Sequence, residues 1–364
     1  MKRTIVVSAI ALQSGGTLSI LQDCLRELSR TAYREYEIHI ILKDKALAGG
    51  DYPSLNFIKV DGTRSYFHRW YYEYYKFNAI SRKLRPDLWL SLHDITPNVS
   101  AATRAVYCHN PSPFYSITPR EFFIDPKFGL FTWLYWILYK INIHKNDFVV
   151  VQQQWLRTAF ARKFSLAENR IIVARPDNEA LPASQMGSTG HTFFYPSFPR
   201  VFKNFELIGH AVQLLHSKGI QHFRVILTLD GTENKYARMI RRQFGHLPEI
   251  IWMGLVARSK VFEVYTECDY LIFPSRLETW GLPISEFRST GKPILLADLP
   301  YAHETAGNYP SLIFFDPRDA VQLAGQMECL ISGKTMPHDP PDVVRPNAPA
   351  ADTWSELFKI MLKN

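Results

Sequence analysis

The feature that most constrains the fold is an alternation of short apolar runs with amphipathic helical segments. In the first half the apolar runs are IVVSAIAL (residues 5–12), EIHIILK (37–43), DLWLSLH (87–93), AVYCHN (105–110) and DFVVVQQ (147–153). The segment after the first run repeats leucine at positions 18, 21, 25 and 28, a spacing that puts these side chains on one helix face. Such strands separated by helices predict a parallel sheet with helices on both faces.

The alternation stops at residues 174–190, a polar stretch rich in Pro, Gly and Ser, and then starts again. The apolar runs of the second half are HTFFYPS (191–197), FRVILTLDG (223–231), EIIWMG (249–254), YLIFPS (270–275), KPILLAD (292–298) and LIFFD (312–316). We therefore predict two doubly wound α/β domains, at residues 1–175 and 191–335, joined by a linker at 176–190. Residues 336–364 form an extension whose final helix is a candidate to pack back on the first domain.

The bulk properties agree with this division and narrow the class of partner. A chain of 364 residues is about right for two domains. A net charge of +8 suits an anionic partner, whether a nucleic acid, an anionic membrane surface or a phosphorylated small molecule. The four cysteines are too far apart for a zinc motif or a disulfide framework, which favours a reducing, cytoplasmic compartment. The basic start followed by an apolar run invites a check for a signal peptide, but a buried first strand explains it better.

The most specific local feature is the string PSRLETWGLPISEFRSTGKPILLAD, residues 274–298. It predicts a strand, a loop and a helix, with Pro283 in the first turn of that helix and Gly291 at its end. Glu278 lies in the loop and Glu286 near the start of the helix, with seven residues between them. Backbone N–H groups beside Gly281 can hold a phosphate, and the two carboxylates can accept hydrogen bonds from sugar hydroxyl groups. A surface glutamate and a glutamate that only favours the helix dipole are the alternative.

This string resembles the signature of the family 4 glycosyltransferases, retaining enzymes of the GT-B fold in which two Rossmann-like domains face each other across a cleft. The resemblance implies that Glu278 contacts the donor sugar and that Glu286 binds the ribose of the nucleotide. It also implies that Thr279, Gly281 and Leu282 belong to the donor loop. The backbone around Met253, Leu255 and Val256, in the segment WMGLVARSK, is similar to the turn that contacts the nucleobase.

The segment FFYPSFPRVFKNF supplies the cations that the resemblance requires. By this resemblance Lys203, and with it Arg200, holds the donor diphosphate and stabilises negative charge on the departing nucleotide. Arg200 stands closer to the lysine than the family pattern has it, so Lys203 is the firmer assignment. In the first half Gly15 and Gly16 precede the first helix, where a glycine pair lets a backbone N–H group approach a phosphate.

Polar residues also follow two strands of the first half. His109 lies where the resemblance implies a histidine that reaches the donor sugar, although a lone histidine at a strand end is as often structural. His93 and Asp94 are candidates for the acceptor site. The chain has no Asp-any-Asp pair, so we expect neither a catalytic metal nor a cofactor, with the nucleotide sugar as donor substrate.

Two aromatic stretches have two interpretations each. Residues 67–77 (FHRWYYEYYKF) could pack in the ordinary way, or face an acceptor or a membrane surface. Residues 128–143, within FGLFTWLYWILYKINIHK, could form a buried helix or lie on an anionic membrane. No stretch reaches the ~18 apolar residues of a transmembrane helix.

Together with these features, the resemblance implies a retaining, metal-independent transferase that moves a sugar from a UDP- or GDP-linked donor to a glycan acceptor. We expect this acceptor to be lipid-linked, in bacterial surface-polysaccharide assembly, with the enzyme cytoplasmic or peripheral on the inner membrane face. A non-catalytic protein that binds nucleotide sugars on the same scaffold is the alternative. A nucleic-acid-binding protein is favoured by the charge alone, since the chain has no nucleic-acid motif. The donor sugar, the base, the acceptor and the linkage cannot be deduced from the sequence.

Overall fold

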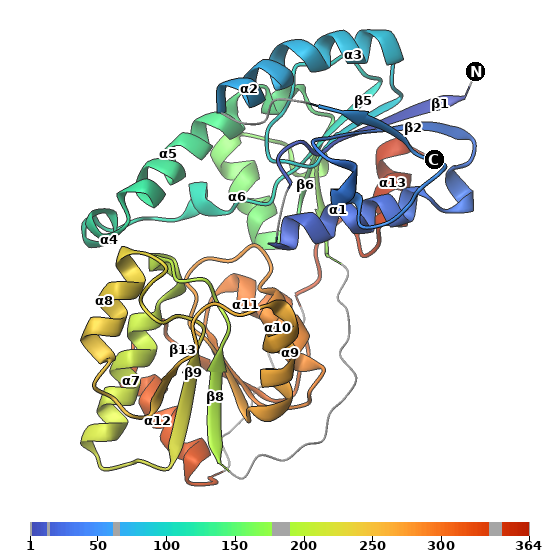
Figure 1. The fold of residues 1–364 in the computed structure, drawn as a ribbon. Coiled ribbons are helices and arrows are strands. Elements are labelled where there is room, and N and C mark those ends of the chain that lie inside the picture. Colours follow the sequence, from blue (N-terminus) through green and yellow to red (C-terminus); the bar gives the residue numbers. More distant parts are fainter. Residues whose placement is uncertain (1, 13–14, 61–65, 177–189, 335–343, 364) are drawn as a thin grey trace. The chain divides into compact units, whose positions relative to one another are not determined.

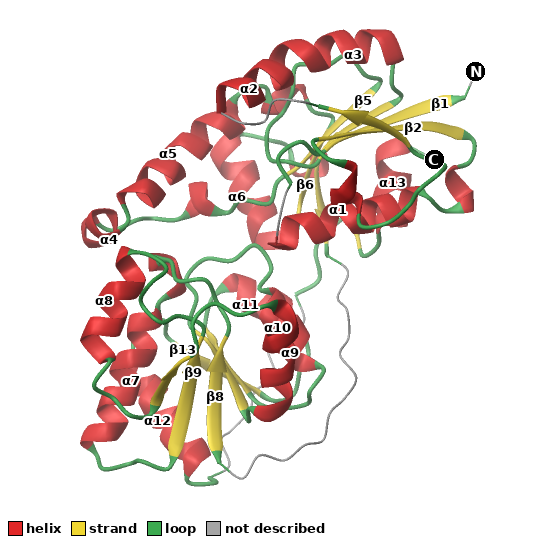
Figure 2. Ribbon diagram, in the orientation of Figure 1, coloured by secondary structure: helices red, strands yellow, loops and turns green. Residues whose placement is uncertain are grey.

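The computed structural model describes residues 2–12, 15–60, 66–176, 190–334 and 344–363, which form two compact units (Figure 1). The first unit comprises residues 1–114, 132–177 and 345–364, and the second comprises residues 115–131 and 178–344. Each unit is built on its own parallel sheet, as the alternation of apolar runs predicts (Figure 2). Of the predicted linker, residues 177–189 lie outside the described residues.

The sheet of the first unit has eight parallel strands in the order β14-β7-β6-β5-β4-β1-β2-β3. Its strands are β1 (Arg3–Ser8), β2 (Tyr36–Leu42), β3 (Asn56–Lys59), β4 (Leu88–Ser91), β5 (Thr103–Tyr107), β6 (Phe148–Val151), β7 (Ile171–Ala174) and β14 (Ala350–Ala351). The helices that accompany them are α1 (Gly15–Leu28), α2 (Tyr66–Tyr71), a π-helical turn η3 (Tyr72–Lys76), α3 (Phe77–Leu84), α6 (Gln154–Phe164) and α13 (Trp354–Leu362).

Both faces of this sheet are buried, because successive residues of its strands enter different cores. Ile5 and Val7 of β1 pack with side chains of α1 and α13, whereas Val6 packs with Phe77 of α3 on the opposite face. The C-terminal helix α13, drawn in red, contacts α1, so the predicted extension lies in the first unit (Figure 1).

The second unit has a six-stranded parallel sheet in the order β10-β9-β8-β11-β12-β13. Its strands are β8 (His191–Tyr195), β9 (Phe223–Leu227), β10 (Ile250–Trp252), β11 (Tyr270–Phe273), β12 (Ile294–Ala297) and β13 (Leu312–Phe315). Its helices are α7 (Phe205–Ser217), α8 (Lys235–Phe244), α9 (Arg258–Glu267), α10 (Leu282–Arg288), α11 (Pro300–Ala306) and α12 (Ala320–Ile331).

One segment belongs to a different unit from the one its position in the sequence suggests. Residues 115–131 hold α4 (Pro119–Ile124) and the start of α5 (Pro126–Lys140), and they cluster with the second unit. There Glu121 pairs with Arg276 at 2.7 Å, and the rings of Phe128 and Phe202 lie 5.0 Å apart. The sequence places all residues up to 175 in one domain because these tertiary contacts leave no local pattern.

The elements differ in detail from the prediction. Most observed strands are shorter than the apolar runs, and β3, β7 and β14 are not predicted at all. The sequence suggested that Gly15 and Gly16 precede the first helix. Helix α1 in fact begins at Gly15, so the two glycines form its first turn. The first-turn N–H groups of a helix have no partner within the helix, so Gly15 and Gly16 still offer the backbone N–H groups that the sequence led us to expect. Among the described helices, none is long and apolar enough to cross a bilayer.

Candidate functional site

Each sheet has one pair of neighbouring strands at which the strand order reverses. In the first unit this pair is β1 and β4, and in the second unit it is β8 and β11. Ligands of open α/β sheets bind outside the carboxyl ends of the strands at such a switch point. Most site residues predicted from the sequence follow one of these four strands, so the topology of each unit gathers them at its switch point.

Lys203 and Glu278 meet at the switch point of the second unit. Lys203 ends a short 3-10 turn, Val201–Lys203, after β8, and Glu278 lies in the loop after β11. The ammonium group of Lys203 forms a salt bridge with the carboxylate of Glu278. Their side chains keep 16% and 13% of their surface exposed, so both groups can be reached by a ligand. The arrangement places a cation beside a hydrogen-bond acceptor.

Asn204, which was not predicted from the sequence, fixes the Lys203 loop. Its backbone is left-handed (φ 60°), a conformation that asparagine tolerates better than most residues. Its side-chain amide donates to the backbone oxygens of Pro274, at 3.2 Å, and Pro317, at 2.8 Å. The hydroxyl of Tyr195 donates to the backbone oxygen of Lys203 at 2.9 Å. An asparagine between a strand and a helix is the sequence signal that could have revealed this role.

The Glu278 loop is held with similar rigidity. The hydroxyl of Tyr301 donates to the backbone oxygen of Ser275 at 2.6 Å. Gly281 has φ 85°, and a Cβ at this position would lie 3.0 Å from Ile284, so the turn into α10 requires glycine. Thr279 is half-buried in this loop, and Leu282 is the first residue of α10.

Two buried tyrosines hold the loops on either side of the Lys203–Glu278 pair. Burial, reinforced by the negative charge of Glu278, raises the pKa of both Tyr195 and Tyr301. Both phenols therefore stay protonated and keep donating at neutral pH.

Glu286 lies in α10 and is nearly buried, with 9% of its surface exposed. It accepts a hydrogen bond from the hydroxyl of Tyr265 at 3.1 Å and pairs with Arg258 at 3.0 Å. Burial and the charge of Glu286 raise the pKa of Tyr265, so this phenol remains a donor.

The turn before Arg258 contains Met253, Leu255 and Val256. The backbone N–H of Met253 donates to Leu227 at 2.9 Å, and Leu255 is exposed. Gly254 has φ 72°, and a Cβ there would meet the Asp230 carboxylate at 3.1 Å. This turn therefore brings its backbone close to the loop after β9.

Arg200 is engaged away from Glu278. Its guanidinium pairs with Asp125 at 3.2 Å and lies over the ring of Phe198. Arg276, which was not predicted from the sequence either, pairs with Glu121 and, at 3.4 Å, with Glu206. The basic groups near the Lys203 loop are thus divided between one that faces Glu278 and two that anchor the segment 115–131.

At the switch point of the first unit, Asp94 organises the ends of two strands. Its backbone is left-handed (φ 69°), and one carboxylate oxygen accepts from the backbone N–H of His109 at 2.5 Å and of Asn110 at 3.1 Å. The same oxygen accepts from the hydroxyl of Tyr139 at 2.9 Å. These contacts give Asp94 a structural role, and an acceptor-binding role of Asp94 stays a prediction.

His109 is buried, with 8% of its surface exposed, and its ring stacks on Tyr107. Nε2 lies 2.8 Å from the backbone oxygen of Leu92, which only accepts, so we assign the ring proton to Nε2. Burial lowers the pKa of His109 against the opposing effect of Asp94. The imidazole is therefore neutral at pH 7.

His93 is 1% exposed and belongs to a cluster with the buried Glu73 and the partly buried Arg69. Its Nδ1 lies 3.0 Å from the backbone oxygen of Ser8, and its Nε2 pairs with the Glu73 carboxylate. Arg69 donates to the backbone oxygen of His93 at 2.6 Å and lies 3.5 Å from Glu73. Burial alone would lower the pKa of Arg69, but the charge of Glu73 raises it. His93 thus ties the end of β1 to the end of β4, and its predicted acceptor contact is not tested.

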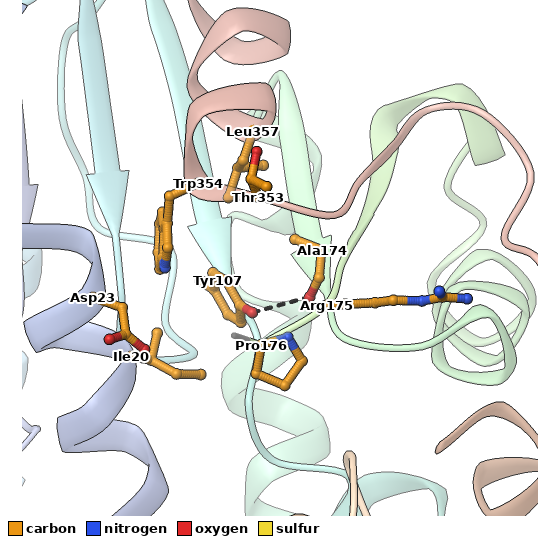
Figure 3. Close-up of a pocket in the computed structure, with 9 residues that line it drawn as sticks. All are labelled: Ile20, Asp23, Tyr107, Ala174, Arg175, Pro176, Thr353, Trp354 and Leu357. Carbon is orange, nitrogen blue, oxygen red and sulfur yellow. Dashed lines mark hydrogen bonds between the residues drawn. The ribbon is translucent and has the colours of Figure 1, made fainter. Parts of the chain in front are cut away.

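A small pocket of the first unit lies between α1, α13 and the ends of β5 and β7 (Figure 3). Tyr107 donates to the backbone oxygen of Ala174 at its base, and Asp23 and Trp354 line its walls. None of the site residues predicted from the sequence lines it. Within the part of the chain that the structure describes, no three acidic, histidine or cysteine side chains gather where they could hold a metal ion.

Comparisons with known proteins bear on the second unit most directly. Residues 190–342 match the family described as Glycosyl transferases group 1. A search of curated proteins finds no match.

Solved structures are similar over most of the chain. One is a glycosyltransferase from Rickettsia africae ESF-5, with 15% identity and a TM-score of 0.62 over 91% of this chain and 88% of that chain. Another is the lipopolysaccharide outer core galactosyltransferase WaaB, with 13% identity and a TM-score of 0.63 over 91% and 90%. A third is Anabaena HepE in complex with UDP and glucose, with 12% identity and a TM-score of 0.63 over 90% of each chain. The fold is GT-B, with two doubly wound Rossmann-like domains.

Proposed function

We propose that the chain is a retaining glycosyltransferase, which moves a sugar from a nucleoside-diphosphate sugar to a glycan acceptor. The observation that supports it most is the Lys203–Glu278 pair at the switch point of a unit that matches Glycosyl transferases group 1. A site that takes up a diphosphate and a sugar needs a cation and an acceptor of hydroxyl hydrogen bonds next to each other. This pair supplies both.

In this proposal Lys203 stabilises the charge that grows on the departing nucleoside diphosphate. The bound diphosphate takes the place of Glu278 as the partner of the ammonium group. The carboxylate of Glu278 then accepts hydrogen bonds from hydroxyl groups of the donor sugar. Glu286, held by Tyr265 and Arg258, accepts from the ribose hydroxyl groups. The hydrogen-bonded loops that hold Lys203 and Glu278 support such a role because a preformed site needs little reorganisation.

We propose a front-side reaction. The acceptor hydroxyl attacks the anomeric carbon on the face from which the diphosphate leaves. The bond from that carbon to the phosphate oxygen breaks, and a phosphate oxygen takes the hydroxyl proton. The absence of an evident nucleophile in the sequence supports this step, and trapping a covalent glycosyl-enzyme would contradict it. Lys203 supplies the positive charge that a metal would otherwise provide, so we expect transfer to continue in excess chelator.

For the donor we propose a UDP- or GDP-linked sugar, and for the acceptor a lipid-linked glycan of bacterial surface polysaccharide. The similar structure of HepE holds UDP and glucose, and WaaB is named for the outer core of lipopolysaccharide. The net charge of +8 suits work at the anionic cytoplasmic face of a membrane.

Ligand-induced thermal stabilisation tests the donor site. The wild type is heated with UDP, GDP, ADP, CMP and their sugar conjugates, because a ligand that binds only the folded state raises the melting temperature. We expect one nucleotide class to stabilise the protein and Glu286→Ala to reduce the shift. Glu263→Ala, which breaks the exposed pair with Lys260 on α9, is the matched control and should leave the shift unchanged.

Turnover separates the enzyme from the non-catalytic alternative. With the stabilising donor and acceptor glycans, an enzyme releases the free nucleotide, whereas a binding protein shows the thermal shift alone. If no nucleotide stabilises the wild type, the proposed donor site is wrong.

A further inference from the structure

The exposed large apolar side chains of the first unit are concentrated on two helical segments. Among the described residues of this unit, all of them lie on α2–η3 or on the part of α5 after residue 131: Phe67, Trp70, Tyr71, Tyr75, Trp133 and Leu134. Phe67 is 84% exposed and Trp133 is 63% exposed. Single exposed apolar side chains are ordinary, but a concentration of aromatic ones marks an interaction surface. We call these two segments the aromatic face.

The aromatic face belongs to firmly packed helices. On α2–η3 the exposed rings recur at intervals of three and four residues, which places them on one side. The opposite side holds Glu73, which is fully buried, and leads to the buried Phe77 of α3. The exposed rings also pack on each other, with Trp70 5.5 Å from Tyr75. Their exposure is therefore a property of a well-anchored surface.

The two segments are neighbours, because the side chain of Tyr135 on α5 lies close enough to Arg69 of α2 to raise the pKa of its guanidinium. Helix α5 has 15 residues, Pro126–Lys140, too few to cross a bilayer. It is nevertheless apolar around most of its circumference, and Trp133 and Leu134 are exposed on it. Such a helix with an exposed apolar side suits the plane of a membrane interface.

The two segments of the chain that carry the aromatic face contribute exposed charges of one sign. Residues 126–146 contain no acidic residue, and residues 66–86 contain only Glu73, which is buried. The exposed cations include Lys76, Arg82, Lys83, Arg85 and Lys140. The ammonium groups of Lys76 and Lys140 lie over the rings of Tyr71 and Trp136, at 5.7 and 5.4 Å. Lysines with stems along apolar rings and charges at the rim match anionic headgroups.

We propose that the aromatic face binds the surface of a bilayer that contains anionic phospholipid, with its rings among the headgroups and its cations on the phosphates. A second copy of the same face would bring like charges together, whereas anionic lipid complements them. The proposal names the partner of the first unit, and it rests on the proposed function for the view that the acceptor is lipid-linked. Membrane binding itself requires no nucleotide sugar, so it can fail or succeed independently of transfer.

Co-sedimentation with vesicles tests the proposal on the full chain without any donor. We expect the wild type to sediment with vesicles of phosphatidylcholine and phosphatidylglycerol, and far less with phosphatidylcholine alone or at high salt. The double substitution Trp70→Ser and Trp133→Ser should lower the partition coefficient about tenfold or more, since aromatic burial drives interfacial binding. Val321→Ser, which removes an apolar side chain 70% exposed on α12, is the matched control and should bind like the wild type.

Circular dichroism and the nucleotide-induced thermal shift of the double variant show whether both units remain folded. The proposal is overturned if the wild type stays in the supernatant with anionic vesicles, or if the folded double variant binds as well as the wild type. It is also overturned if light scattering shows dimers of the wild type that Trp133→Ser dissociates, because a second copy would then occupy the face. Transfer to a lipid-free acceptor by the double variant, at the wild-type rate, would leave the proposed function intact in each case.

Discussion

The two switch points use polar side chains in opposite ways. In the second unit Lys203 and Glu278 pair with each other and remain partly exposed, while buried tyrosines and Asn204 hold their loops. In the first unit His93 and Asp94 are themselves the holding groups, bonded to backbone atoms of neighbouring strands. The same position in a fold can thus hold either a partly exposed ion pair or buried side chains that fix the backbone. Exposure and the nature of the partner, and not residue type, distinguish the two uses.

The comparison predicts that substitution of the Lys203–Glu278 pair changes ligand chemistry, whereas substitution of His93 or Asp94 changes stability. The largest effect should come from Lys203→Met, which keeps the stem and removes the charge. We expect the transfer rate to fall about 100- to 1000-fold, as when one group that stabilises transition-state charge is lost. Lys218→Met, which breaks an exposed pair with Glu328, should leave the rate unchanged in the same assay. An unaltered transfer rate in Lys203→Met would contradict the proposed role of Lys203 in stabilising the leaving group.

The converse substitution is Asp94→Ala. It removes the acceptor of the His109 N–H, while the Asn110 N–H and the Tyr139 hydroxyl keep contacts with each other, and this should cost the first unit about 1–3 kcal/mol of unfolding free energy. Asp94→Asn keeps an acceptor oxygen and tolerates the left-handed backbone, so it should cost less. Hydrogen exchange measured by mass spectrometry resolves the two units. Faster exchange confined to the second unit would break the comparison.

A backbone substitution sharpens the comparison within the second unit. Gly281→Ala forces a side chain into a left-handed conformation close to Ile284, and should destabilise the loop by about 1–2 kcal/mol. Gly325 lies in α12, where an added Cβ meets open space, and Gly325→Ala should stabilise the unit by about 0.5–1 kcal/mol. Denaturant unfolding of the two variants checks both signs. Equal effects would mean that the turn does not depend on glycine.

The smallest effect is on pH dependence. Because burial lowers the pKa of His109, the unfolded chain binds this proton at a higher pH than the folded chain does. The neutral ring therefore contributes stability that is fully present above the unfolded pKa of about 6.5 and is lost as pH falls below it. We expect His109→Asn to flatten the decline of first-unit stability between neutral and mildly acidic pH. An unchanged slope, measured by hydrogen exchange, would contradict a neutral buried ring.

The two units also differ in how much the sequence could predict. Glu278 and Glu286 lie within one continuous string, so local spacing was enough to predict the strand, loop and helix that hold them, while their roles toward a donor are implied by the family resemblance and stay a prediction. The cluster of Arg69, Glu73 and His93 joins a helix to strands far along the chain, and no local pattern indicates it. The assignment of residues 115–131 to the second unit was missed for the same reason.

Side-chain burial was the least predictable property. The sequence placed His93 at the end of a strand, but only the fold shows that its ring is enclosed by Ser8 and Glu73. For α5 the sequence left a buried helix and a surface helix open, and the structure exposes Trp133 and Leu134. An apolar composition predicts that a helix forms contacts, but it does not reveal with what.

Adjacent positions of α2 and η3 should tolerate opposite kinds of redesign. Trp70 and Tyr71 lie outward, whereas Arg69, one residue earlier, holds the backbone of His93. Consecutive helical residues are about 100° apart, so the outer rings can be exchanged for polar groups without touching the inner contacts. A variant with polar groups at the outer positions, and with Arg69 and Glu73 unchanged, should therefore keep the fold of the first unit. Substitutions at the outer positions of this helix would then test membrane binding, and substitutions at its inner positions would test folding.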